Sequence, residues 1–272
     1  MVPDELEESV FHGETASSYA RYRRWYPSEL IDDLARRFSG NGRGRLLDLG
    51  CGTGHLLLPL ASVFDQAVGV DPEPDMLREA ARLAADTGVR NVEWVRGAST
   101  DLPTLRFRLG RFDLVTIGTA FHFMDPHATL AALRDVVRLG GGVVVAYNGS
   151  PMWLHPTPWS EAIRRVLESW LGPLRDTDFD DRALRECESA MTALNYTNVE
   201  RWEHVYESSI DLDFIVGHIY SALSPEQLPS DQRPTFEQHL REAVAAIAPS
   251  KRVTETVRVR AVIGLRQAPP PR

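Results

Sequence analysis

An apolar run that ends in an acidic residue and continues into three closely spaced glycines stands at residues 46–56, as LLDLGCGTGHL. Glycine lets the backbone turn sharply and approach a ligand closely, because it has no Cβ and tolerates positive φ. A buried strand followed by such a turn and then a helix forms the kind of crevice that binds nucleotides. This segment therefore predicts an α/β fold with a ligand site at the end of its first strand.

The spacing of Gly50, Gly52 and Gly54 separates two kinds of nucleotide site. The dinucleotide fingerprint G-x-G-x-x-G uses its third glycine where the helix packs on the strand. In this chain the third glycine comes one residue early, and His55 stands at that position. Asp48 precedes the turn, and a carboxylate there suits a cationic ligand group better than a pyrophosphate. The pattern therefore favours a positively charged ligand over a nicotinamide dinucleotide.

A second apolar run, QAVGVD at residues 66–71, ends in Asp71. Rossmann-like sites place an acidic residue in this region, where it accepts hydrogen bonds from a ribose diol. Asp followed by Pro is also typical of a helix N-terminus, so Asp71 is compatible with capping a helix that begins near Pro72. We expect Asp71 to bind ribose, and the two roles do not exclude each other.

From about residue 45 to 147 short apolar runs alternate with amphipathic segments, which predicts a parallel sheet covered by helices on both faces. Right-handed crossovers bring the carboxyl ends of such strands to one edge, so Gly50, Asp71 and the loop 118–123 are expected there. A loop rich in Pro, Gly and Trp follows at 148–160. Beyond it the spacing predicts helices at 159–170, 181–194, 214–223 and 236–247, and strands at 199–207 and 253–265.

Composition and charge exclude several functions. The formal net charge is -8, and no Lys/Arg cluster is long enough to track a phosphate backbone, so no nucleic-acid partner is expected. The basic and aromatic stretch at 19–27 is interpreted as a helix whose tyrosines and tryptophan face the core while its arginines face water. Cys51 and Cys187 lack metal-ligand spacing and the histidines are scattered, so we expect no metal and reduced thiols in the cytoplasm. No apolar run reaches the length of a membrane span, and the acidic start of the chain does not resemble a signal peptide.

Six blocks in a fixed order resemble the small-molecule branch of the class I S-adenosylmethionine-dependent methyltransferases. Besides LLDLGCGTGHL they are FHGETASSYARYRRWYPSEL at 11–30, VGVDPEPDML at 68–77, GASTDLP at 97–103, FDLVTIGTAFHFMD at 112–125 and LRDVVRLGGGVVV at 133–145. The resemblance implies a Rossmann-like, seven-stranded, mostly parallel sheet with an antiparallel final strand. It also implies N-terminal lid helices at 1–40, a cofactor-binding core at 41–150, an acceptor-binding cap at 151–195, a part completing the sheet at 196–266 and a flexible tail at 267–272.

The same resemblance implies the contacts with S-adenosylmethionine. Residues expected around the methionine part and the ribose are Asp48, Gly50, Cys51, Gly52, Gly54 and Asp71. Residues expected at the adenine are Pro72 and Met76, and in the loop GASTDLP Ala98 replaces the usual acidic residue, so Ser99 or a backbone carbonyl is expected to take over its contact. Residues expected at the sulfonium and over the methionine end are Gly118, Thr119, Tyr19 and Arg23.

His122 is the histidine expected beside the transferring methyl group. An imidazole titrates near neutral pH, so His122 can act as a general base, although a positioning or packing role fits this place in the family equally well. The expected walls of the acceptor pocket are Tyr22, Phe121, Trp153, His155 and Trp159. The last three are also compatible with holding the cap on the sheet.

These features predict an enzyme that methylates an oxygen, nitrogen or carbon atom of a small organic acceptor, as a monomer or homodimer, with specialised metabolism as the expected context by analogy. One alternative is a descendant that keeps the cofactor without methylating, of a binding or cyclase type. A nucleic-acid methyltransferase is disfavoured by the acidic charge and by FHFM at 121–124 in place of an N/D-P-P-Y/F block. A nicotinamide dehydrogenase is disfavoured by the glycine spacing.

Overall fold

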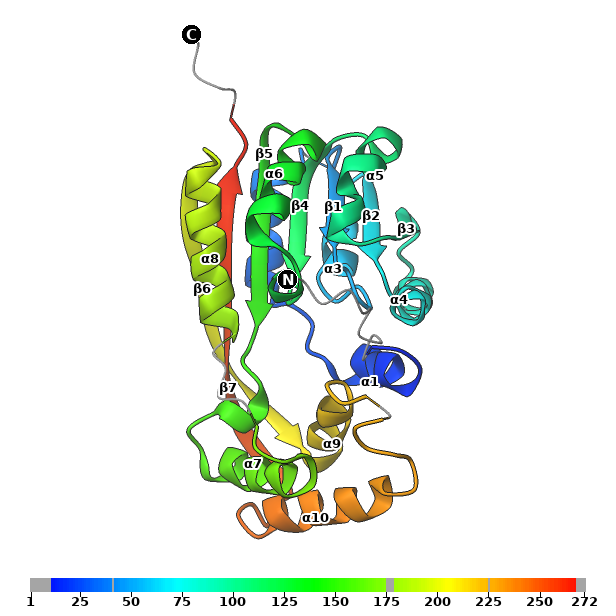
Figure 1. Cartoon of the computed structure of the whole chain (residues 1–272), viewed down its shortest axis with the longest axis vertical. Helices are drawn as coiled ribbons and strands as arrows, with labels where there is room; N and C mark the ends of the chain where they lie inside the picture. Colours follow the sequence, from blue (N-terminus) through cyan, green and yellow to red (C-terminus); the bar gives the residue numbers. More distant parts are fainter. Residues whose placement is uncertain (1–10, 41, 175–178, 225, 268–272) are drawn as a thin grey trace, which may run out of the picture.

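The computed structural model describes residues 11–40, 42–174, 179–224 and 226–267. A seven-stranded sheet with the order β3-β2-β1-β4-β5-β7-β6 forms its centre (Figure 1). The five parallel strands are β1 (Arg45–Leu49), β2 (Gln66–Asp71), β3 (Val92–Arg96), β4 (Phe112–Gly118) and β5 (Val137–Asn148). Strand β7 (Arg252–Leu265) lies antiparallel between β5 and β6 (Thr197–Asp211). This arrangement confirms the predicted Rossmann-like sheet and its antiparallel last strand.

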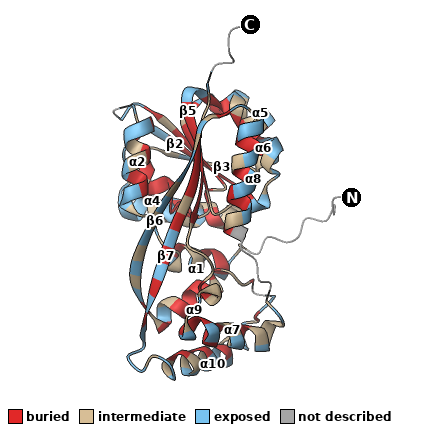
Figure 2. Cartoon of the chain, turned by 90° about the vertical axis from the view of Figure 1, so that its left-hand side faces the viewer, coloured by how far each residue is buried: buried red, intermediate tan, exposed pale blue. Residues whose placement is uncertain are grey.

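Both faces of the sheet are covered because side chains of the central strands alternate between two apolar clusters. On β5, Val143 and Val145 belong to one cluster, and Val144 and Ala146 belong to the other. The first face carries α5 (Leu102–Leu109), α6 (Pro126–Val136) and α8 (Phe179–Ala193). The second carries α2 (Ser28–Phe38) and α3 (Leu57–Ala61), with α4 (Pro74–Thr87) beside β2 and β3. Figure 2 shows the buried residues concentrated in the strands and on the inward sides of these helices.

A smaller lobe lies beyond the carboxyl ends of the parallel strands (Figure 1). It contains α7 (Pro158–Leu171), α9 (Leu212–Tyr220) and α10 (Arg233–Ala245), which share an apolar cluster of their own around Phe236 and Trp159. Pairing of β7 with β5 stops at Val259, whereas pairing with β6 continues to Arg252. The extended β6 and β7 therefore form a two-stranded ribbon that carries the lobe away from the sheet.

The helices divide between core and lobe differently from the predicted segments. Within 151–195, α7 and the short η3 (Met152–Leu154) lie in the lobe, whereas α8 packs on the sheet through its apolar inward side, which consists of Leu184, Cys187 and Met191. Within 196–266 the reverse holds, since α9 and α10 join α7. At the N-terminus α2 packs on the sheet, while α1 (Glu14–Tyr22) lies between α4 and α9. The expected tail at 267–272 falls outside the described residues except for Gln267.

Helix α4 begins later than the sequence suggests. Its first residue is Pro74, and its N-cap is Glu73, whose side chain accepts a hydrogen bond from the backbone N–H of Asp75 at 3.2 Å. Asp71 therefore does not cap this helix. Asp71 is the last residue of β2, and its carboxylate points toward the glycine turn, where it accepts a hydrogen bond from Gly52.

Candidate active site

Two adjoining cavities lie at the carboxyl ends of β1, β2, β4 and β5. The β2-side cavity has a volume of about 360 Å³ and the β5-side cavity about 330 Å³. Their common wall consists of the glycine turn, the end of β4 and three aromatic rings: Gly50, Gly52, Gly118, Thr119, Phe11, Tyr19 and Phe123. An elongated ligand can therefore lie across the turn with one end in each cavity.

The glycine turn is shaped for close approach. Gly50 has φ +69°, and a Cβ on it would lie 2.7 Å from the Cβ of Ala120, so no side chain fits there. Gly52 has φ +51° and faces open space. Gly54 lies behind the turn against Leu58 and lines neither cavity. The turn thus exposes backbone to a ligand at Gly50 and Gly52, while Gly54 serves the packing of α3.

Asp71 stands at the β2-side cavity with both carboxylate oxygens fixed by backbone. Oδ2 accepts a hydrogen bond from the N–H of Gly52 at 2.8 Å, and Oδ1 accepts one from the N–H of Glu73 at 2.9 Å. Burial nevertheless raises the pKa of Asp71 to about 6, against the opposing effect of these two donors. Each oxygen retains lone-pair capacity for a further donor. A pre-oriented carboxylate of this kind can hold a pair of hydroxyl groups.

Asp48 is the second carboxylate of the turn and is only 1% exposed. Its Oδ1 accepts a hydrogen bond from the hydroxyl of Thr116 at 2.7 Å. Burial raises the pKa of Asp48 to about 7, a shift that the hydrogen bond from Thr116 reduces and the nearby charge of Asp71 increases. A buried carboxylate is costly to ionise unless a cation compensates it. A positive group beside Asp48 would therefore stabilise its ionised form.

Other residues expected to contact the cofactor line one or the other cavity. Pro72, Met76, Ala98 and Ser99 line the β2-side cavity, together with Glu73 and Gly97. Cys51 lines the β5-side cavity, and burial keeps its thiol protonated by raising the pKa well above the usual value. The backbone N–H of Ala98 donates to the Asp101 carboxylate at 2.8 Å, which fixes the loop that carries Ala98 and Ser99.

Thr119 holds an unusual backbone conformation between the two cavities. Its φ is +52°, a value that a β-branched residue rarely adopts. The Tyr26 hydroxyl donates to the carbonyl of Ala146 at 3.2 Å and lies 3.0 Å from the Thr119 hydroxyl, which can donate to it. Tyr26 was not singled out in the sequence. It holds the strained residue that faces both cavities.

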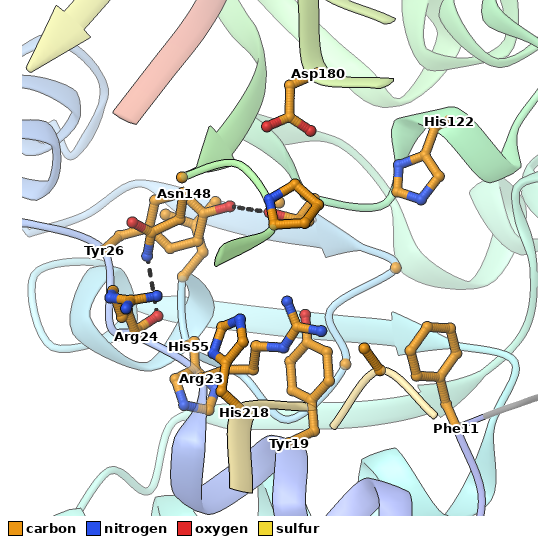
Figure 3. A pocket seen from close by; sticks show the side chains of 18 of the residues that line it. Phe11, Tyr19, Arg23, Arg24, Tyr26, His55, His122, Asn148, Asp180 and His218 are labelled. Carbon is orange, nitrogen blue, oxygen red and sulfur yellow. Dashed lines mark hydrogen bonds between the residues drawn. The ribbon is translucent and has the colours of Figure 1, made fainter. Parts of the chain in front are cut away.

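Arg23 and Arg24 of the stretch 19–27 point inward while Arg21 is exposed, so the interpretation of this stretch as a helix with its arginines in water is wrong for these two residues. Helix α1 ends at Tyr22, and the chain then extends between sheet and lobe. Arg23 lines the β5-side cavity, donates from Nε to the Ser221 hydroxyl at 2.7 Å and lies over the Tyr19 ring (Figure 3). Arg24 forms a buried ion pair with Glu255. Trp25 is instead 40% exposed.

His122 lies on η2 (Phe121–Phe123) at the mouth of the β5-side cavity. Its Nδ1 lies 3.2 Å from the hydroxyl of the buried Tyr147. The side chain of His122 is exposed on one side, and desolvation by the protein on the other side lowers the pKa of its imidazole to about 4, which favours the neutral form at physiological pH. A neutral imidazole held through one nitrogen can accept a proton at the other.

Of the five residues expected to wall the acceptor pocket, only Trp153 lines it. Phe121 and Trp159 are buried in the sheet cluster and the lobe cluster, respectively. Tyr22 packs on Gly217 and Phe214, and His155 lies 3.3 Å from the carbonyl of Ser150. Tyr22, His155 and Trp159 therefore make contacts of the lobe, Phe121 belongs to the core of the sheet, and none of the four lines the cavity.

Several lining residues were missed by sequence reasoning. They are Phe11, Arg24, His55, Phe123, Asn148, Asp180 and His218. Arg24 and His55 directly neighbour predicted residues, so proximity to the motifs was an available signal. Asp180 and His218 come from α8 and α9, and nothing in their local sequence sets them apart. Across the described ranges, no cluster of three or more Asp, Glu, His or Cys side chains could hold a metal, and no described helix is long and apolar enough to span a bilayer.

Comparison with known proteins places this geometry in context. Residues 46–141 match a family model described as a methyltransferase domain. An uncharacterized methyltransferase of Mycobacterium bovis, Mb3374, is 27% identical over 220 residues, covering 81% of each chain. An uncharacterized methyltransferase of Bacillus subtilis, YcgJ, is 26% identical over 162 residues, which span 58% of this chain and 60% of YcgJ.

Solved structures share the fold. The crystal structure of YcgJ superimposes with a TM-score of 0.53 at 18% identity, covering 89% of this chain and all of YcgJ. The [4+2]-cyclase SpnF superimposes with a TM-score of 0.50 at 17% identity, covering 91% of this chain and 85% of SpnF. At these identities the likeness concerns the fold alone.

Proposed function

Because the chain belongs to the class I S-adenosylmethionine-dependent methyltransferases, we propose that it transfers the methyl group of S-adenosylmethionine to a small organic acceptor held in the β5-side cavity. One observation carries the proposal: the buried carboxylates of Asp48 and Asp71 flank a single glycine turn that opens on both cavities. This cradle complements a ligand that has a cationic amino acid end and a ribose.

The residues present fit this cofactor. The contact that a Cβ at Gly50 would make with Ala120 keeps this position a glycine and the turn tight, and a cationic group beside Asp48 would stabilise its buried carboxylate in the ionised form. In this proposal Asp48 holds the amino group, Arg23 holds the carboxylate, and Asp71 accepts from the ribose hydroxyls. Pro72, Met76, Ala98 and Ser99 surround the adenine in the β2-side cavity. Gly118 and Thr119 face the sulfur.

When bound, the cofactor supplies an electrophilic methyl carbon, whose bond to sulfur breaks with its electron pair leaving on sulfur as the acceptor's lone pair forms the new bond. The protein contributes mainly alignment and exclusion of water. Phe11, Tyr19 and Phe123 cover the junction of the two cavities. His122, neutral and held by Tyr147, can accept the proton that an acceptor loses.

Calorimetric titration with S-adenosylmethionine tests the cofactor assignment. Asp71→Ala removes the carboxylate at the ribose and is expected to weaken binding by about tenfold or more, since hydrogen bonds to a charged group contribute about 1.5–3 kcal/mol each. Asp65→Ala, which removes an exposed carboxylate just before the other end of β2, is the matched control and should bind normally. Equal affinity of Asp71→Ala and wild type would refute the assignment.

Detection of S-adenosylhomocysteine separates methyl transfer from the alternative of a protein that binds the cofactor without methylating. The fold is compatible with both, since the [4+2]-cyclase SpnF shares it. A methyltransferase forms one S-adenosylhomocysteine for each methylated acceptor. Tight cofactor binding with no such product across a broad acceptor panel would favour the alternative.

A further inference from the structure

His218 is a buried histidine on the lobe side of the β5-side cavity. It lies on α9, is 5% exposed and lines the cavity. In Figure 3 its ring extends from α9 toward the cavity, beside Arg23 and away from His122. The cofactor contacts and the proton acceptor proposed above do not involve this side chain. His218 is therefore a polar group of the acceptor space that has no role in the proposed function so far.

The protein fixes both the orientation and the tautomer of the His218 ring. Its Nδ1 lies 3.2 Å from the backbone carbonyl oxygen of Tyr22. A carbonyl oxygen only accepts, so Nδ1 carries a hydrogen and donates it to Tyr22. The ring of Phe214 stacks on the imidazole with a centroid distance of 5.7 Å. Because Nδ1 is engaged and one face is covered, Nε2 is the nitrogen left for a ligand in the cavity.

Nε2 of His218 carries a lone pair. Burial lowers the pKa of His218 well below its ordinary value, and the charges of Arg23 and Arg24 lower it further, so the imidazole is neutral. A neutral imidazole with its hydrogen on Nδ1 can only accept a hydrogen bond at Nε2. Within the described part of the chain, the one hydrogen bond of this ring is the bond to Tyr22. A ligand that supplies a donor to Nε2 therefore gains affinity.

The surroundings of His218 favour an uncharged donor. The charged groups that act most strongly on its imidazole, Arg23 and Arg24, are both cations. A neutral imidazole supplies no negative charge to compensate an ammonium group that is buried beside it. A carboxylate or an ether oxygen would present lone pairs to the lone pair of Nε2. A hydroxyl group is uncharged and donates, and Trp153 and Pro151 offer apolar surface of the same cavity to its carbon skeleton.

We propose that His218 determines acceptor specificity by accepting a hydrogen bond at Nε2 from a hydroxyl group, and that the acceptor is an uncharged, mostly apolar alcohol or phenol. The carbon skeleton of the acceptor lies against Trp153 and Pro151. His218 orients the acceptor and takes no proton from it, because a second proton on the ring would add a cation beside Arg23 and Arg24. This inference rests on the proposed function and specifies its substrate class.

Nitrogen-15 NMR of the imidazole rings tests the tautomer in the ligand-free protein. In wild type, Nδ1 of His218 should give the shift of a protonated nitrogen and Nε2 that of an unprotonated one. The signals are assigned by their loss in His218→Asn. Addition of a hydroxylated ligand should move the Nε2 signal toward lower shift, as a hydrogen bond to its lone pair does. A protonated Nε2, or an unchanged Nε2 signal with the ligand bound, overturns the proposal.

Matched probes test the substrate class by binding. 2-Phenylethanol, 2-fluoroethylbenzene and phenethylamine share a skeleton, and 2-naphthol with 2-fluoronaphthalene forms a phenol pair. Fluorine is close in size to a hydroxyl group but donates no hydrogen bond. Ligand-observed NMR measures each affinity for the protein saturated with S-adenosylhomocysteine. In wild type, 2-phenylethanol should bind more tightly than phenethylamine.

The preference for a hydroxyl probe over its fluorinated partner should depend on His218. This affinity ratio should fall by about fivefold in His218→Asn, which keeps an N–H for the Tyr22 carbonyl but lacks Nε2. The difference in hydrophobicity between the two probes cancels when the ratios of wild type and variant are compared. His239→Asn is the matched control and should keep the ratio of wild type, because His239 also belongs to the lobe, bonds to Trp170 and lines neither cavity.

Three binding results would overturn the proposal. They are no binding of any hydroxylated probe to wild type, binding of phenethylamine as tight as that of 2-phenylethanol, and an equal hydroxyl-to-fluoro ratio in wild type and His218→Asn. If His218→Asn does not fold, the ligand-induced shift of Nε2 in wild type decides.

A cofactor titration keeps the two proposals separate. Failure of wild type to bind S-adenosylmethionine in calorimetry would refute the proposed function. Normal cofactor binding together with any of the three binding results would refute the role of His218 alone.

Discussion

The hydroxyl of Tyr26 lies 3.0 Å from the hydroxyl of Thr119, and this contact joins the chain after α1 to the loop after β4. Thr119 has φ +52° and lines both cavities. A strained residue keeps such a conformation only where its surroundings enforce it. Tyr26 is therefore a positioning residue, which acts on the site through Thr119.

Tyr26→Phe should weaken the hold on Thr119 and lower the affinity for S-adenosylmethionine by about fivefold, corresponding to about 1 kcal/mol for one hydrogen bond. Tyr196→Phe also removes a buried hydroxyl, which donates to the carbonyl of Leu130 at 2.8 Å far from the cavities. Both variants should lose similar stability, but calorimetry should show weaker cofactor binding only for Tyr26→Phe. An equal loss of cofactor affinity in both variants would mean that the loss comes from lower overall stability and not from the contact with Thr119.

Cofactor affinity should rise with pH. The pKa of Asp71 is raised to about 6 and that of Asp48 to about 7 in the ligand-free protein, so both carboxyl groups are partly protonated in weak acid. A cation beside Asp48 and hydroxyl groups that donate to Asp71 favour the ionised forms, so binding near pH 6.5 should release protons. Calorimetry in buffers of different ionisation enthalpy measures this release, and Asp48→Asn should reduce it. Affinity that is independent of pH from about 5.5 to about 8 would contradict the burial argument.

Asp48→Asn should stabilise the ligand-free protein while weakening cofactor binding. The pKa of about 7 for Asp48 in the folded protein lies above the ordinary aspartate value of 3.8, so the folded state binds more protons than the unfolded state between these pH values. The contribution of protonated Asp48 to the free energy of unfolding is present at low pH and is lost as the pH rises toward about 7. At pH 8 the variant should therefore melt at a higher temperature, by about 2–4 °C for each kcal/mol recovered. An equal or lower Tm at pH 8 would show that the ionised carboxylate is already compensated.

Glu255→Gln should strongly destabilise the protein, because it leaves Arg24 buried without its partner. Breaking a buried pair in this way costs about 3–5 kcal/mol. Glu203→Gln removes the acidic partner of Arg258 in an exposed pair between β6 and β7 and should cost less than about 1 kcal/mol. Chemical denaturation of both variants, and of Arg24→Met/Glu255→Gln, provides the measurement. The double variant should recover part of the loss, and equal small effects of both single variants would contradict a structural role for the buried pair.

His122 should remain neutral throughout the physiological pH range. Desolvation lowers its pKa to about 4, so its side-chain NMR signals should not titrate above about pH 5.5. The signals can be assigned from their loss in His122→Gln. A transition near pH 6.5 would show that water reaches the ring freely, and it would weaken the case for His122 as a proton acceptor in the site.

The sheet and its glycine turn were predictable because their signals are local. Short apolar runs define the strands, and the spacing of Gly50, Gly52 and Gly54 places a turn after β1. Asp48 and Asp71 follow from their places at strand ends, since parallel strands share one edge for their carboxyl termini. These statements need only residues close together in the chain.

The direction of the arginines and the walls of the acceptor cavity depend on tertiary contacts, and the sequence pattern does not contain them. Helical spacing predicts that Arg23 and Arg24 face water. The helix ends at Tyr22, however, and the extended chain that follows runs between the sheet and the lobe. Asp180 reaches the cavity because α8 packs on the sheet, and His218 because α9 meets α1. Trp159 and Phe121 have the composition of pocket residues, yet each is buried in an apolar cluster.

The length of the ribbon that β6 and β7 form beyond Val259 sets the distance between the lobe and the sheet. Side chains alternate along a strand with a period of two residues, so adding or removing a pair of residues on each ribbon strand keeps inward and outward positions unchanged. Such an edit would move Ser221 and His218 relative to the sheet while leaving Gly50 and Asp71 in place. A change in the length of this ribbon would thus resize the β5-side cavity without altering the glycine turn.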